Sequence, residues 1–142
     1  MLPDRLESGT HNMPGIAGLL EGIRYVQRTG VETIAAHERR LTAQAVALLR
    51  QTEGIRLFWR DGLRHQTGVL SFVVEGVDCE ELGEALARQG IALRAGLHCA
   101  PLAHRTVGTL KTGTVRFSPS AFNTSQQVVQ FAQILQRTIR KM

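Results

Sequence analysis

The chain is poor in cysteine, lysine and large aromatic side chains. Its 142 residues include two cysteines, two lysines, one tryptophan and one tyrosine. Two cysteines do not form a disulfide framework, and reduced thiols are typical of a cytoplasmic protein. No apolar run approaches the ~20 residues of a membrane-spanning helix, and the first residues lack the apolar core of a secretory signal. We therefore expect a globular, cytoplasmic protein without a membrane partner.

Positive charge is in excess but dispersed. The formal net charge is +5, and the arginines occur singly or in pairs without an interleaved series of aromatic residues for base stacking. A zinc site built from His98, Cys99 and His104 would need a further ligand, and Cys79 lies far away in the sequence without a Cys-x-x-Cys clamp. The composition therefore predicts neither a nucleic-acid partner nor a metal site.

Hydrophobic patterning predicts one α+β domain. Four segments have apolar residues at helical spacing, and four short β-branched or aromatic runs are typical of strands. The expected helices cover residues 14–28, 31–52, 79–89 and 124–140, and Asn12, Asp78 and Thr124 are expected to cap the first, third and fourth of them. The expected strands cover residues 55–60, 68–75, 91–95 and 114–118. Because neighbouring strands are joined by short turns, this order predicts a largely antiparallel sheet covered by helices on one side.

The stretch 94–123 carries the residues with the clearest chemistry. A Gly-Leu-His-Cys-Ala-Pro segment is typical of a loop, since glycine permits unusual backbone angles and proline cannot donate to a strand ladder. This loop would present His98 and Cys99, and the following strand would carry Arg116. A thiol can act as a nucleophile, and a planar guanidinium can hold a carboxylate by two parallel hydrogen bonds. The alternative for a lone cysteine is inert packing.

Two motifs in this stretch resemble the C-terminal part of cysteine desulfurases and selenocysteine lyases: R-A-G-L-H-C-A-P-L-A-H-R and G-T-V-R-F-S-P-x-x-F-N-T. These are pyridoxal-phosphate (PLP) enzymes of the class-V aminotransferase fold, and the resemblance extends from about Leu2 to Ile139. It implies that residues 15–142 form the two-layer small domain of a fold-type I PLP enzyme. Residues 1–14 would be an extended segment belonging to the cofactor and dimer site.

The resemblance also implies a reaction, in which a transferase removes sulfur or selenium from L-cysteine or L-selenocysteine. Cys99 would attack that atom of the PLP-bound substrate, leaving a persulfide on the enzyme and releasing alanine. Arg116 matches the residue that binds the substrate carboxylate, and Arg94 would assist it, orient the loop or form a structural salt bridge. His98 matches the second histidine of the family's His-His-Cys-Ala block and would tune the thiol, unless it is a solvated loop residue.

The family's cofactor anchor has no counterpart here. Lys111 and Lys141 are the only lysines, and neither stands in the family's histidine-lysine context. Thr10 is similar to a residue that contacts the PLP phosphate of the opposite subunit. We therefore expect the C-terminal part of a homodimeric enzyme that acts on an amino-acid substrate, hands sulfur to an acceptor protein and is inactive without its upstream PLP domain.

Two other functions stay open at this point. One is a class-V aminotransferase or lyase that has no cysteine nucleophile. The other is a non-catalytic dimerisation or interaction module. The motifs do not separate sulfur from selenium as the substrate atom.

Overall fold

The chain divides into two compact units, Met1–Thr33 and Ile34–Met142. The computed structural model describes residues 2, 4–6, 9–60, 62 and 66–142. In the first unit, a short 3-10 helix η1 (Asp4–Leu6) precedes the long helix α1 (Met13–Thr29). Within the segment that the sequence predicts to be extended, residues 1–14, the described residues Asp4–Leu6 form one 3-10 turn.

Helix α1 begins and ends where its sequence predicts. The side-chain Oδ1 of Asn12 accepts a hydrogen bond from the backbone N–H of Gly15 at 3.0 Å, and Gly30 follows the last turn. An asparagine cap satisfies an N–H group that has no partner within the helix. The helix buries none of its residues. Its apolar stripe is exposed over Ile16, Leu19, Leu20, Ile23 and Val26.

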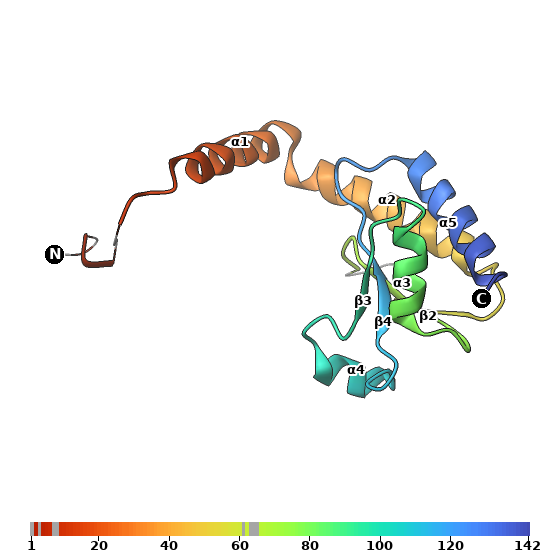
Figure 1. The fold of residues 1–142 in the computed structure, drawn as a ribbon. Coiled ribbons are helices and arrows are strands. Elements are labelled where there is room, and N and C mark those ends of the chain that lie inside the picture. The colour runs from red at the N-terminus through yellow and green to blue at the C-terminus, as the bar shows by residue number, and fades with distance from the viewer. Residues whose placement is uncertain (1, 3, 7–8, 61, 63–65) are drawn as a thin grey trace. The chain divides into compact units, whose positions relative to one another are not determined.

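The second unit contains a four-stranded sheet and its helices (Figure 1). The elements in chain order are α2 (Val31–Leu49), β1 (Ile55–Phe58), β2 (Leu70–Val74), α3 (Cys79–Ala87), β3 (Arg94–Gly96), α4 (Pro101–Val107), β4 (Thr114–Phe117) and α5 (Ser125–Ile139). The strand order is β1-β2-β4-β3, and every neighbouring pair is antiparallel. The predicted α+β fold with an antiparallel sheet is confirmed.

One face of this sheet forms the hydrophobic core. Along β2, Leu70, Phe72 and Val74 are buried, whereas Ser71 and Val73 between them are half-buried. This alternation places one set of side chains under the helices and leaves the other on the opposite face of the sheet. The helices contribute Leu41, Ala45, Val46, Leu49, Leu82, Leu86, Val128, Phe131, Ala132 and Leu135 to the core.

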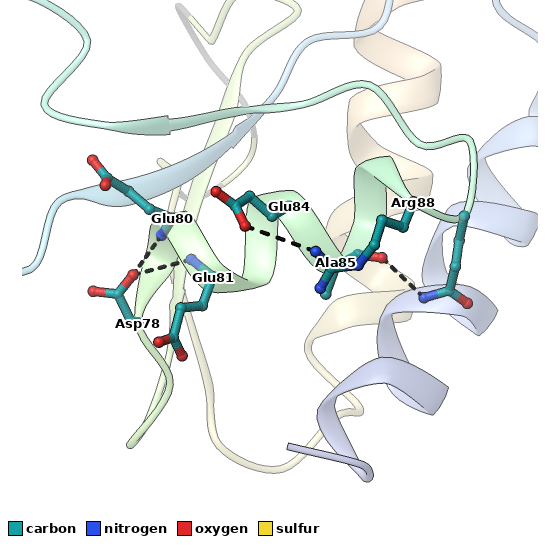
Figure 2. Close-up of polar contacts among 7 residues, drawn as sticks. Asp78, Glu80, Glu81, Glu84, Ala85 and Arg88 are labelled. Carbon is teal, nitrogen blue, oxygen red and sulfur yellow. Dashed lines mark hydrogen bonds and ion pairs between the residues drawn. The ribbon is translucent and has the colours of Figure 1, made fainter.

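The start of α3 is fixed by Asp78, as its sequence predicts. The Oδ1 atom of Asp78 accepts hydrogen bonds from the N–H groups of Glu80 at 2.8 Å and Glu81 at 3.1 Å (Figure 2). A carboxylate at this position also complements the positive end of the helix dipole. The cap positions Cys79 as the first helical residue, where its side chain is buried.

Two predictions near the cysteine loop are wrong: the limits of one strand and the absence of a helix after the loop. The expected strand 91–95 is only Arg94–Gly96, because the N–H of Ile91 donates to the carbonyl of Leu86 at 3.1 Å and closes the end of α3 instead. The seven-residue helix α4 stands where the sequence predicts only a loop and a turn. Within the described ranges, no helix is long and apolar enough to cross a membrane.

Candidate active site

Cys99 lies at the tip of a tight turn between β3 and α4. The carbonyl of Leu97 accepts a hydrogen bond from the N–H of Ala100 at 2.9 Å, which closes the turn. The two central residues, His98 and Cys99, have φ angles of 50° and 58°. Positive φ at both positions is the pattern of a type I′ turn, and for residues other than glycine it costs about 1–3 kcal/mol each. The turn leaves the thiol of Cys99 exposed, as expected for a loop cysteine.

The ring of His98 is tied to β4. Its Nε2 atom lies 3.1 Å from the carbonyl oxygen and 3.2 Å from the hydroxyl of Thr114. Because a carbonyl only accepts hydrogen bonds, Nε2 carries the proton in the neutral ring and Nδ1 keeps its lone pair. The Nδ1 atom is buried and has no hydrogen-bond partner among the described residues. The residue before Cys99 therefore carries a nitrogen, Nδ1 of His98, that can accept a proton.

Two arginines face each other across β3 and β4. Arg94 is the register partner of Arg116, and Ser71 of β2 is the next residue in the same row. Like charges directly opposite each other destabilise a sheet. In the described parts of the chain neither arginine belongs to an ion pair, and the buried Nε of Arg116 has no hydrogen-bond partner. The pair is thus suited to bind an anion such as a carboxylate.

Burial keeps His98 neutral. It is the largest cause that lowers the pKa of the ring, and electrostatic repulsion from Arg116, His104 and Arg94 acts in the same direction. The hydrogen bond to Thr114 opposes them but does not outweigh them. The ring therefore offers a lone pair rather than a positive charge to its surroundings at neutral pH.

The lowered pKa predicts a pH-dependent stability. Below about pH 6.5 the unfolded chain protonates His98 while the folded chain does not, so the free energy of unfolding falls until the pH reaches the folded pKa. Urea unfolding of the wild type and of His98→Gln between about pH 7.5 and pH 5 measures this contribution. The wild type should lose more stability than the variant as the pH drops. An equal loss in both proteins would contradict the assignment.

The remaining candidates are placed as follows. Thr10 is an exposed residue of the first unit and follows Gly9, whose φ is 87°. Cys79 lies outside the turn, and burial raises the pKa of its thiol, in keeping with an inert packing role. His104, to which the sequence assigned no direct part, is buried with its ring centroid 5.8 Å from that of His98. In the described part of the chain, no three His, Cys, Asp or Glu side chains gather to hold a metal.

The fold is that of cysteine desulfurase chains. The apo structure of a cysteine desulfurase from Thermococcus onnurineus superposes with a TM-score of 0.87 at 31% identity, covering 99% of this chain and 34% of that one. A cysteine desulfurase from Escherichia coli, solved in an S-sulfonic acid form, gives a TM-score of 0.84 at 30% identity with the same coverage, 99% and 34%.

Sequence comparison leads to the same class of protein. The family model of the class-V aminotransferases matches residues 1–131. A cysteine desulfurase from Synechococcus elongatus is 44% identical over 135 residues, and a probable cysteine desulfurase from Mycolicibacterium paratuberculosis is 42% identical over 135 residues. Each alignment covers 95% of this chain but only 21% and 19% of the respective relative. The chain belongs to the aminotransferase class-V family and spans about a fifth of the length of these relatives.

Members of this family use PLP, but the residues described here do not fit its anchor. Lys111 is exposed and lines two cavities, of ≈ 770 and ≈ 320 Å³, together with Asp78 and Cys79. None of the residues around the candidate site (Cys99, His98, Arg116) lines either cavity. The other lysine, Lys141, is next to the last residue of the chain. The described site therefore carries a thiol and a pair of arginines, without a lysine to join to the cofactor.

Proposed function

We propose that this chain is the part of a cysteine desulfurase that carries the sulfur-accepting thiol and the substrate clamp. One arrangement supports the proposal: the turn that carries the exposed Cys99 directly follows β3, whose Arg94 pairs with Arg116 of β4, and neither arginine has an acidic partner in the described structure. A small amino acid with a carboxylate and a sulfur atom matches both groups. L-Cysteine is the substrate that the names of the relatives favour, and L-selenocysteine has the same shape and charge.

The chemistry assigned to the chain is a sulfur transfer. The thiolate of Cys99 attacks the substrate sulfur and forms a sulfur–sulfur bond, while the bond between that sulfur and the substrate Cβ breaks. The electron pair of the broken bond stays on carbon, which takes up a proton, so that alanine leaves and a persulfide remains. PLP supplies the electron sink for this cleavage when it is bound. The Nδ1 lone pair of His98 accepts the thiol proton, and Arg116 with Arg94 holds the carboxylate.

The cofactor is assigned to another region of the complete enzyme. Because the lysines here do not fit the site, that region carries the PLP lysine and this chain completes the site. We further assign residues 1–14 to the cofactor and dimer site of a homodimer, with Thr10 as a contact to the PLP phosphate. Residues 15–142 are then the small domain. The exposed position of Cys99 lets an acceptor protein collect the persulfide sulfur.

The proposal is tested by joining the chain to a PLP-binding large domain. In a chimera, the chain replaces the matching C-terminal third of the Thermococcus onnurineus enzyme, whose chain it covers over 34%. Alanine and sulfide release from L-cysteine, with PLP and dithiothreitol, is measured for the chimera and for the chain alone. We expect turnover from the chimera and none from the chain. A folded, PLP-loaded chimera without turnover would contradict the proposal.

One observation favours a second function, an interaction module without catalysis. Helix α1 presents an apolar stripe in which Leu19 is 65% exposed and Ile16 is 51% exposed. An apolar face of this kind is typical of a surface that another chain or domain covers. A stoichiometric complex of the chain with a PLP-binding protein, in which that protein's own turnover is independent of Cys99, would favour this function.

A further inference from the structure

A second histidine is built into the structure behind the cysteine turn. His104 of α4 is 5% exposed, and its ring lies against that of His98 with the planes tilted by 40°. The Nδ1 atom of His104 is 2.8 Å from the hydroxyl oxygen of Thr109, which is fully buried. A buried imidazole with one side-chain partner is held in one orientation, since leaving that nitrogen unpaired would cost the full desolvation of a polar group.

Backbone hydrogen bonds extend this contact into a closed cycle of contacts that connects His104 and His98. The N–H of Thr109 donates to the carbonyl of His104 at 2.8 Å, and the N–H of Gly113 donates to the carbonyl of Thr109 at 2.8 Å. The next residue, Thr114, accepts from Nε2 of His98. The path thus runs from His104 through the connection between α4 and β4 and returns to His98, whose ring touches His104 again.

This cycle of contacts includes His98, one of the two non-glycine residues with positive φ among those that the structure describes. His98 and Cys99 both have positive φ, a conformation that persists only where the surrounding structure enforces it. The turn has one internal hydrogen bond, from Ala100 to Leu97. The contacts of the His98 ring are a further means by which the rest of the domain holds the turn, in addition to the hydrogen bond from the N–H of His104 to the carbonyl of Ala100 at 3.1 Å.

We propose that His104, held by Thr109, is a positioning residue for Cys99. Its buried ring is the surface against which His98 rests, so that Nε2 of His98 stays on Thr114 and Nδ1 stays free of a proton. The use of that acceptor in sulfur transfer rests on the proposed function. The positioning itself is a property of this chain and is measured without PLP or substrate.

The test removes the hydroxyl of Thr109 without changing its shape. In Thr109→Val, the 15N signals of the His98 ring should move away from a single Nε2–H form. Alkylation of Cys99 by iodoacetamide at neutral pH should slow by roughly two- to tenfold, the worth of one hydrogen bond. Thr109→Ser, which keeps the hydroxyl, should behave as the wild type.

Thr106→Val is the matched control. Thr106 lies on α4, as His104 does, is exposed, and its hydroxyl donates to the carbonyl of Leu102 at 3.0 Å. We expect it to leave the His98 signals and the alkylation rate at the wild-type values. Equal losses in Thr106→Val and Thr109→Val would overturn the proposal, as would unchanged His98 signals or an unchanged alkylation rate in Thr109→Val.

Two further measurements decide the matter if Thr109→Val does not fold. His104→Asn keeps a polar group toward Thr109 but has no ring to support His98, so it should slow alkylation, and a wild-type rate would overturn the proposal. In the wild-type chain, a His98 ring with its proton on Nδ1 would overturn it as well. A chimera that fails to release alanine while these results hold would remove the proposed function and leave the positioning role intact.

Discussion

Replacing Cys99 with serine should abolish persulfide formation in the PLP-loaded chimera and lower alanine release from L-cysteine by at least roughly a thousandfold. The hydroxyl has nearly the size of the thiol, so the turn is preserved, but it is far less acidic and a far poorer nucleophile toward sulfur. The persulfide is measured by mass spectrometry of the intact protein after reaction without reductant. Alanine is measured in the same samples.

The second cysteine provides the matched control. Cys79 is buried at the start of α3, and burial raises the pKa of its thiol, so Cys79→Ala should keep both the persulfide and the alanine release. A persulfide that disappears in Cys79→Ala, or alanine release that is unchanged in Cys99→Ser, would show that the nucleophile has been assigned wrongly.

Replacing Arg116 with lysine should raise the KM for L-cysteine by roughly ten- to 150-fold, the loss expected for a charge-assisted hydrogen-bond pair. Lysine keeps the charge but lacks the planar fork of the guanidinium. Its single terminal nitrogen cannot replace the buried Nε of Arg116. Because the clamp binds a group that does not react, kcat should change less than KM. Steady-state kinetics of the chimera measure both constants.

Two comparisons make this result specific for the carboxylate. Arg56→Lys changes an arginine of β1 that lies over the ring of Phe58, 4.8 Å from its centroid, and should leave KM unchanged. Cysteamine, which has the thiol and amine of cysteine but no carboxylate, should react equally slowly with the wild type and Arg116→Lys. A loss with cysteamine as large as that with L-cysteine would mean that Arg116 acts on something other than the carboxylate.

The local sequence predicts those parts of the fold that depend on short-range interactions. The caps Asn12, Asp78 and Thr124 each occupy the position that their side chains predict, because capping involves residues only two or three positions apart. Hydrophobic spacing likewise predicts the long helices and the buried strand β2. The antiparallel arrangement is predicted correctly, but the short turns that the prediction rests on are absent: β3 and β4 are connected through α4, and β2 and β4 are not consecutive in the chain.

The local sequence does not predict those parts of the fold that depend on tertiary contacts. Helix α4 has seven residues, too few for a periodic pattern, and Pro101 is typical both of a loop and of the first turn of a helix. The burial of His104 and its contact with Thr109 follow from the placement of this helix, so no local pattern could have predicted them. The same holds for the register that sets Arg94 opposite Arg116.

The left-handed turn at His98 and Cys99 has a consequence for engineering. Glycine or asparagine in place of Cys99 would relax the backbone at that position and make the domain more resistant to heat. Under the proposed function, this gain would discard the thiol. A design programme for a heat-tolerant form should therefore keep this turn unchanged and look for its gains among the exposed positions of the helices.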